Sequence, residues 1–232
     1  MNTRARKNVT VSHAGGVATI SVDDGKVNAV SMNLIAELHG AFDEAAERES
    51  VVILHGRPGI FSAGFDLKYL ASSPDAAVEL TAAGARLAAR IMRHEDPVIS
   101  VCTGHAYPMG AFMLMSTDYV VGVAGDFRLG LNEVAIGLTV PGFAVELARY
   151  RLDPASFRRT VTAGYLFSPD EACAAGMLDV VAGSEDEAMG LAQSKAEAFL
   201  AVDRPSFRGT KAKMHAAFLE HFDAVVEAEL AQ

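Results

Sequence analysis

The segment Phe61-Ser62-Ala63-Gly64-Phe65-Asp66-Leu67-Lys68 decides how the fold is interpreted. It follows the apolar run 51–54, which predicts a short buried strand, and it leads into a predicted helix. Backbone N–H groups at the start of a helix have no partner inside the helix and favour an anion. Taken alone, the segment is better explained as a tight strand-to-helix turn that uses Gly64 only for its conformation.

A second turn of the same kind is Gly104-His105-Ala106-Tyr107-Pro108-Met109-Gly110. It follows the apolar run 98–102 and precedes a short apolar helix. Pro108 has no N–H and suits the first turn of that helix, whereas Met109 can still donate its N–H. Two such turns after neighbouring parallel strands could direct two N–H groups at one thioester carbonyl, as in an oxyanion hole. Tyr107 could line a pocket there, although such residues are more often satisfied structural groups.

A third segment, Gly130-Leu131-Asn132-Glu133, places one acidic side chain before the mostly apolar residues 134–138. A carboxylate in an apolar setting should have a raised pKa, which suits a group that carries a proton. An exposed glutamate favoured by the dipole at a helix start explains the same residues equally well. The residues alone leave both interpretations open.

The periodicity along the chain alternates short apolar strands with helices, which predicts an α/β architecture with parallel strand pairing. Helix starts are indicated by a capping residue at Ser31, by Ser73-Pro74 and Asp153-Pro154, and by capping boxes at Ser168 and Ser184. Strands are predicted at 9–12, 17–22, 51–54, 98–102, 119–123 and 126–129. The chain is predicted to be mostly helical from 141 onward, with a helical tail over 204–232.

Composition and charge restrict the class of protein. The chain has 232 residues, of which half are apolar and 21% are charged, and this suits one large domain or one domain with a small helical appendage. Its net charge of −9 argues against a nucleic-acid backbone as partner. A site for a polyanionic ligand needs only a few local cations, so such a ligand stays possible.

No targeting or metal signal stands out in the sequence. The polar, basic start Met1–Lys7 is not followed by an apolar segment, so we expect no secretory signal and a cytoplasmic protein. No run approaches the roughly 20 apolar residues that a membrane-spanning helix needs. Cys102 and Cys173 are interpreted as reduced core thiols rather than as a disulfide, and the histidines have no spacing typical of metal ligands.

The three segments together resemble the crotonase (enoyl-CoA hydratase/isomerase) superfamily, from about Val9 to about Gly183. Residues 61–68 are similar to the family segment F-x-A-G-x-D-L, and residues 104–110 to its G-x-A-x-G-G-G turn. Two further segments match: Lys26-Val27-Asn28-Ala29-Val30-Ser31 resembles an early N-A-[L/V]-[S/T] segment, and 167–179 a later A-x-x-x-G-[L/M]-[V/I]-D segment. Each is degenerate, but their order and spacing are specific.

The resemblance implies a fold and a site. The fold would be a spiral of ββα turns over residues 1–183, with a C-terminal helical region at 184–232 that packs in homotrimers, often paired into hexamers. The oxyanion donors would be the N–H groups of Phe65 and Met109, and Glu133 would be the catalytic acid/base. The substrate would be an acyl-CoA thioester. Its contacts would involve Ser62, Ala63 and Phe65, with Lys68 as a phosphate contact and Tyr107 lining the pocket.

Phe112 is the informative departure from the family pattern. Hydratases of the family usually carry a glutamate at this position and a second one at the position of Glu133. A phenyl ring can neither hold a water nor exchange a proton, and it would dry the site. One carboxylate suits the Δ3,Δ2-enoyl-CoA isomerase reaction of fatty acid metabolism and β-oxidation, and residues 130–133 look especially like the mitochondrial-type isomerase branch. That reaction needs no metal or redox cofactor, since coenzyme A is part of the substrate.

Three alternatives remain open at this point. The first is an enoyl-CoA hydratase, and the second is another crotonase reaction such as decarboxylation, dehalogenation or thioester hydrolysis, because one fold supports many reactions. The third is an acyl-CoA-binding protein without catalysis. The replacement of two family glycines by Pro108 and Met109 is the observation that keeps this third alternative open.

Overall fold

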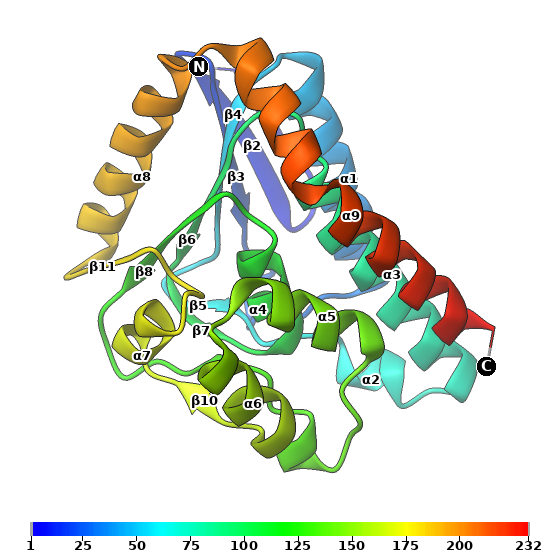
Figure 1. Cartoon of the computed structure of the whole chain (residues 1–232). Helices are drawn as coiled ribbons and strands as arrows, with labels where there is room; N and C mark the ends of the chain where they lie inside the picture. Colours follow the sequence, from blue (N-terminus) through cyan, green and yellow to red (C-terminus); the bar gives the residue numbers. More distant parts are fainter. Residues whose placement is uncertain (1, 232) are drawn as a thin grey trace.

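A seven-stranded sheet forms the centre of the protein, whose computed structural model describes residues 2–231 (Figure 1). Its first strands pair antiparallel, and the strands from β3 to β11 pair in parallel. The strand order is β1 (Asn2–Ala5), β2 (Val9–Ala14), β3 (Val17–Val22), β4 (Val51–His55), β6 (Val98–Cys102), β8 (Tyr119–Val123) and β11 (Val180–Ala182). The predicted α/β architecture with parallel pairing is confirmed.

A smaller sheet lies across one end of the large one, and it carries the turns identified in the sequence. Its order is β10 (Leu166–Phe167), β9 (Leu129–Gly130), β7 (Gly104–Ala106) and β5 (Gly59–Ser62). The chain passes from β4 to β5 and from β6 to β7, so each of these two large-sheet strands is followed by a small-sheet strand and then a helix. β5 and β7 pair in parallel so closely that a Cβ on Gly104 would lie 2.1 Å from the Gly59 carbonyl group.

Helices cover both faces of the large sheet. On β4, Val52 and Leu54 point toward the core beneath α1 (Met32–Glu47), α3 (Pro74–Met92) and α4 (Pro108–Met115). Val51 and Ile53 point the other way, toward α8 (Glu185–Leu200). Every fourth residue on that face of α8 is a fully buried alanine, which lets the helix approach the sheet closely: Ala188, Ala192 and Ala196.

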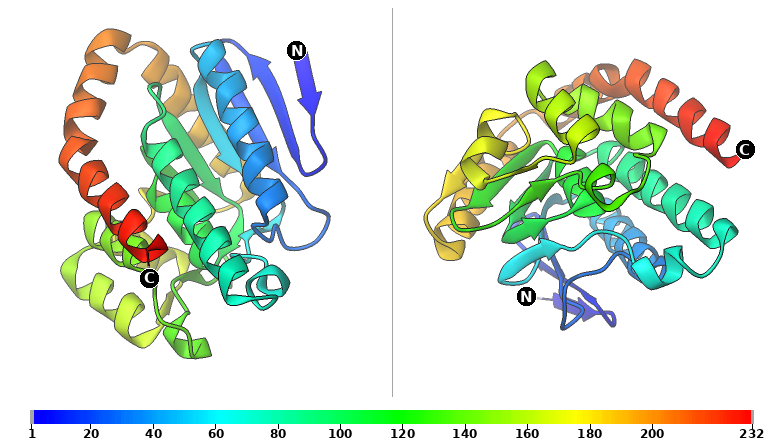
Figure 2. Two further views of the ribbon diagram at one scale, coloured as in Figure 1. Left: turned by 90° about the vertical axis from the view of Figure 1, so that its right-hand side faces the viewer. Right: turned by 90° about the horizontal axis from the view of Figure 1, so that it is seen from below.

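The C-terminal helix α9 (Arg204–Leu230) packs back on its own chain, beside α3 and α5 (Gly142–Arg151) (Figure 2). Its Phe222 is fully buried and meets Phe143 of α5 edge to face at 5.9 Å between ring centroids. The Lys211 ammonium donates to the Asp118 carboxylate at 2.6 Å, close to the end of α4. The remaining helices are α2 (Leu67–Leu70), η1 (Val134–Ile136), α6 (Pro154–Ala163) and α7 (Pro169–Ala174).

Most helix starts lie where the capping residues predicted them. Ser31, Ser73, Asp153 and Ser168 are all N-caps whose side chains accept backbone N–H groups, and the capping box at Ser168 is complete. The box predicted at Ser184 is half formed, because the Glu187 carboxylate accepts the N–H of Gly183 instead.

The predicted strand at 126–129 is wrong. Only Leu129 and Gly130 pair, in β9, because the chain bends at Gly125 and Asp126 and Phe127 follows in irregular backbone. β5 and β7 were predicted as turns, and the short strands β1, β10 and β11 were not predicted.

Two predictions from composition can be compared with the structure. Cys102 and Cys173 are free thiols, buried and partly buried respectively, as predicted. Within residues 2–231, no helix combines the length and the apolar character needed to cross a bilayer.

The Lys211–Asp118 pair should be one of the strongest contacts between α9 and the body. The Lys211 side chain is 6% exposed, and Asp118 also accepts the N–H of Val98. Lys211→Met leaves the Asp118 carboxylate without its cation, so we expect a loss of about 3 kcal/mol in the free energy of unfolding, measured with urea at pH 7. Lys213→Met, an exposed position on the same helix, is the matched control and should change stability by less than about 0.5 kcal/mol. An equal change in the free energy of unfolding for the two variants would show that the Lys211–Asp118 pair is not one of the strongest contacts of α9.

Candidate active site

A pocket of about 740 Å³ opens between α2, α3 and the segment 132–141. Most of its lining is apolar, and Glu133 is the one acidic residue among the described residues that line it. The lining residues are Ala63, Gly64, Phe65, Leu67, Leu70, Ala71, Ala77, Thr81, Tyr107, Pro108, Asn132, Glu133, Ile136, Leu138, Thr139 and Pro141. A concave, mostly apolar pocket with a few polar groups is typical of a small-molecule site.

The turn after β5 is held in a conformation that favours glycine. Gly64 has φ +90°, and its N–H donates to the Ser62 hydroxyl at 3.2 Å. The next residue, Phe65, forms an isolated parallel bridge with Val30 but donates its own N–H to no acceptor among the described residues. A backbone donor is therefore left available at the edge of the pocket.

The turn after β7 lies directly beside the first one. The N–H of Tyr107 donates to the carbonyl of Ser62 at 3.0 Å, and Met109 is the second residue of α4. The Met109 N–H also has no acceptor among the described residues, as expected for the first turn of a helix. The structure thus places two unpaired backbone donors on two adjoining turns.

The Met109 side chain is directed away from the pocket. It is fully buried, and its sulfur lies 3.0 Å from the position that a Cβ on Gly84 of α3 would occupy. The Phe65 ring lies against the same glycine, where the corresponding distance is 2.5 Å. Gly84 leaves room for both side chains, and Met109 is absent from the residues that line the pocket.

Glu133 is buried even though it precedes the 3-10 turn η1. It is 7% exposed, and its Oε2 has no hydrogen-bond partner within the described structure. Burial raises the pKa of Glu133 to about 7, and a hydrogen bond with its own backbone N–H lowers it to a smaller extent. The backbone before it is fixed by Thr160, whose hydroxyl accepts the N–H of Leu131 at 3.0 Å. Of the two interpretations of Glu133, the exposed glutamate at a helix start is wrong, because the carboxylate is buried and its pKa is raised.

The structure brings together some of the other predicted site residues and separates the rest. Ala63, Phe65 and Tyr107 line the pocket with Glu133. Lys68 is exposed on α2 and lies outside the pocket lining. The two remaining residues, Ser62 and Phe112, are buried outside the pocket lining.

Ser62 and Phe112 face the protein interior rather than the pocket. The Ser62 hydroxyl donates to the Asn28 carbonyl at 2.7 Å, and the residue is 1% exposed. Phe112 is fully buried on α4 and meets the Phe143 ring at 5.3 Å between centroids. Neither lines the pocket, so neither is placed to touch a ligand there.

A second cavity of about 380 Å³ adjoins the first and was not predicted from the sequence. The two share Ala77, Thr81, Thr139 and Pro141, so these residues separate two neighbouring cavities. Its other walls come from α3, from Phe143 and from the last turns of α9, including Val226 and Leu230. Apolar residues on distant helices carry no functional signal in a sequence, which is why this cavity was missed. Within residues 2–231, no group of three or more His, Cys, Asp or Glu residues could hold a metal ion.

The sequence profile of the family described as enoyl-CoA hydratase/isomerase matches residues 12–231 of the chain. The matched region spans the pocket, both turns and all of the helices. The chain therefore belongs to the enoyl-CoA hydratase/isomerase family, and it has the crotonase fold.

Relatives with two kinds of name are similar to the chain. A probable enoyl-CoA hydratase, echA17 of Mycobacterium avium, is 30% identical over 218 residues, which cover 89% of this chain and 81% of the relative. The mitochondrial enoyl-CoA delta isomerase 1 of Rattus norvegicus is 26% identical over 233 residues, covering 97% and 80%. A crystal structure of an enoyl-CoA hydratase/isomerase family protein from Pseudomonas syringae superposes with a TM-score of 0.93 at 42% identity, covering 95% and 96%. These comparisons establish a family enzyme and leave the specific reaction unresolved.

The raised pKa of Glu133 should make stability depend on pH. Because the folded-state pKa, about 7, lies above the ordinary value of 4.5, the folded protein keeps a proton that the unfolded chain releases between these values. Raising the pH through this window therefore destabilises the parent protein, whereas Glu133→Gln removes the titration. We expect the free energy of unfolding of Glu133→Gln relative to the parent to rise by about 2 kcal/mol from pH 5 to pH 8.

Urea unfolding at the two pH values measures this difference. Glu220→Gln, at an exposed position on α9, is the control and should track the parent within about 0.5 kcal/mol at both. A Glu133→Gln difference that is the same at pH 5 and pH 8 would show that Glu133 titrates normally.

Proposed function

We propose that the protein is a Δ3,Δ2-enoyl-CoA isomerase in which Glu133 is the only acid/base. The observation that carries this proposal is a single buried carboxylate with a pKa of about 7, in a pocket whose other described lining residues include no acid. A pKa near neutrality lets one group both remove and return a proton, because its two protonation states are similar in free energy at physiological pH.

The two unpaired N–H groups supply the other half of the mechanism. A thioester carbonyl that accepts from both Phe65 and Met109 is polarised, which acidifies the C2 protons of a 3-enoyl chain. Glu133 then takes a C2 proton, and the negative charge spreads into a dienolate whose oxygen stays on the two donors. Return of the same proton to C4 gives the 2-enoyl thioester and restores the Glu133 carboxylate. No atom is gained or lost, and no second base is needed.

Phe112 supports isomerisation over hydration. In the family pattern, hydratases carry a glutamate at this position in addition to the one at the position of Glu133, and it helps to hold the attacking water. Here the position is taken by a fully buried ring that packs on Phe143, so it offers a water no hydrogen-bonding group. An apolar side chain at this position also helps to exclude water that would protonate the dienolate. Hydratase activity remains the alternative, since relatives of that name match the chain equally well.

The second cavity supports a substrate with an extended acyl tail. It adjoins the Glu133 pocket at Thr81 and Thr139, and Val226 and Leu230 of α9 line its other side. With the carbonyl at the two turns, the tail would run past Glu133 into this cavity. The coenzyme A part would leave over Ala63 and Phe65, with Lys68 on the exposed side of α2 as a phosphate contact.

Glu133→Gln tests the proposed chemistry directly. Conversion of 3-hexenoyl-CoA, followed by the rise in conjugated-enoyl absorbance at pH 8, should fall about 10³-fold because the amide cannot carry the proton. In the parent, kcat/KM should rise with pH up to about 7 and then level off, since Glu133 must be ionised to accept the C2 proton. Glu220→Gln should keep the parent rate.

The same assay with crotonyl-CoA separates the two candidate reactions. Little loss of crotonyl-CoA absorbance supports isomerisation, whereas rapid loss would assign a hydratase. A Glu133→Gln variant that isomerises 3-hexenoyl-CoA as fast as the parent would remove the proposal.

Ala82→Leu tests the path of the acyl tail. Ala82 is buried in the wall of the second cavity and does not line the Glu133 pocket, so a larger side chain there should fill only the far end. We expect kcat/KM for 3-dodecenoyl-CoA to fall about tenfold, while the value for 3-hexenoyl-CoA changes by less than about twofold. An equal change for the two substrates would show that the tail does not enter this cavity.

A further inference from the structure

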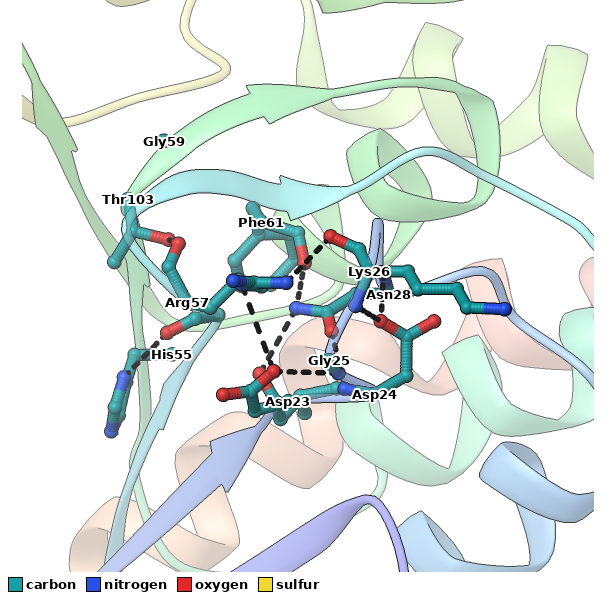
Figure 3. A network of polar contacts seen from close by, with 12 residues as sticks. Asp23, Asp24, Gly25, Lys26, Asn28, His55, Arg57, Gly59, Phe61 and Thr103 are labelled. Atoms are coloured by element: carbon teal, nitrogen blue, oxygen red, sulfur yellow. Dashed lines mark hydrogen bonds and ion pairs between the residues drawn. The ribbon is translucent and has the colours of Figure 1, made fainter.

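Asn28 is a buried residue with an unusual backbone conformation, close to the candidate site but outside the pocket lining. It is fully buried and has φ +52°, in the left-handed region that residues other than glycine rarely adopt. It lies on the segment between β3 and α1, within the polar network of Figure 3. Such a conformation persists only where the surroundings hold it in place.

The Asn28 side chain joins the end of β3 to β5. Its Nδ2 donates to the carbonyls of Val22 at 2.9 Å and Phe61 at 3.1 Å, and its Oδ1 accepts the N–H of Asp24 at 3.0 Å (Figure 3). These partners use both donors of the amide and fix which way it points. Phe61 immediately precedes the turn that carries the Phe65 N–H.

The Asn28 backbone is joined to the same turn. Its carbonyl accepts the Ser62 hydroxyl at 2.7 Å, and that hydroxyl in turn accepts the N–H of Gly64 at 3.2 Å. The neighbours of Asn28 continue the contact: Val27 accepts the N–H of Ala63, and Val30 donates to the carbonyl of Gly64 at 2.7 Å. The segment 27–30 therefore runs along the whole turn and fixes it residue by residue.

Asp24 holds the segment from its other side. Its carboxylate accepts the N–H groups of Lys26, Asn28 and Ala29 at 2.7, 2.9 and 3.2 Å. Although burial raises its pKa, these backbone hydrogen bonds outweigh that effect and hold the pKa of Asp24 below its ordinary value. Arg57 adds a further tie by donating to the carbonyl of Lys26 at 2.8 Å (Figure 3).

We infer that Asn28 is a positioning residue for the oxyanion donor of Phe65, acting through Phe61 and Ser62. It touches neither the pocket nor Glu133, so it would affect the reaction only by setting where the Phe65 N–H points. The same inference gives Ser62 a role different from the one predicted from the sequence, since its hydroxyl holds the turn and does not face the ligand. The kinetic part of this inference rests on the proposed isomerase function.

Asn28→Asp tests the positioning role with the smallest change in side-chain shape. The two side chains have nearly the same shape, and both tolerate the left-handed backbone, but a carboxylate cannot donate to the Val22 and Phe61 carbonyls. We expect kcat for 3-hexenoyl-CoA to fall about 10²-fold with KM within about threefold of the parent, because a misplaced donor weakens transition-state binding most. Asn28→Gly keeps the backbone conformation, removes the amide and should lose activity in the same way.

An infrared measurement reads the donor position without turnover. Saturated hexanoyl-CoA with a ¹³C-labelled thioester carbonyl is bound to each protein, and the carbonyl band is compared with that of the free ester. The parent and Glu133→Gln should shift the band to lower wavenumber, whereas Asn28→Asp should lose at least about half of that shift. Asn33→Asp is the control, since Asn33 is exposed on α1 and donates only to Glu37.

The outcomes separate the inference from the proposed function. A parent that shifts the band but isomerises no 3-enoyl-CoA refutes the isomerase proposal and leaves the positioning role standing. An Asn28→Asp protein with the parent band and the parent kcat refutes the positioning role, and so does a parent that shows no band shift. If both Asn28 variants fail to fold, Ser62→Ala breaks the link to Gly64 and should lower kcat about tenfold with part of the band shift lost. A Ser62→Ala protein with the kcat and the band shift of the parent would then refute the positioning role.

Discussion

The parallel pairing of β5 with β7 is the contact on which the site depends. It brings together two turns that are separated by more than forty residues of sequence, and Gly104 makes the approach possible because any side chain there would overlap the Gly59 carbonyl. Once the strands are paired, Tyr107 and Ser62 share a backbone hydrogen bond and the two unpaired N–H groups lie on adjoining turns. The small sheet thus positions backbone groups, and the large sheet supports it.

Burial of Glu133 adds the second constraint. An unpaired carboxylate in an apolar wall costs free energy when it is charged, and proteins reduce that cost by keeping the group neutral. The segment that carries Glu133 is held by the Thr160 hydroxyl, which accepts the N–H of Leu131. The burial of the Glu133 carboxylate therefore both costs stability when the group is charged and raises its pKa to about 7.

Much of the fold could be predicted because its large-sheet strands are continuous apolar runs bounded by turn residues. The runs 17–22, 98–102 and 119–123 were predicted with the bounds that the structure has, and Ser31 and Ser73 were correct as helix caps. β5 and β7 were not recognised as strands, since they are short and rich in glycine and small residues and exist only because each finds the other. Their pairing is a tertiary contact, which local patterns do not report.

The site was predictable to the extent that it uses short motifs. Phe65, Tyr107 and Glu133 were located from their segments, and the pocket brings them together. The places of Ser62 and Phe112 were not evident, because a motif indicates which residues recur and not which way each side chain points. Thr81, Thr139 and Val226 had no signal at all, because residues on two separate helices and on the segment before α5 define the second cavity only after they pack.

The position of α9 has a consequence for how the protein matures. The wall formed by Val226 and Leu230 belongs to the last part of the described chain, whereas Glu133 and both donor turns are synthesised much earlier. During translation, Glu133 and both turns can therefore fold before the α9 wall of the second cavity exists. That wall is added only when α9 leaves the ribosome and docks through Phe222 and Lys211. A nascent chain would in this way complete the Glu133 pocket before it completes the neighbouring cavity.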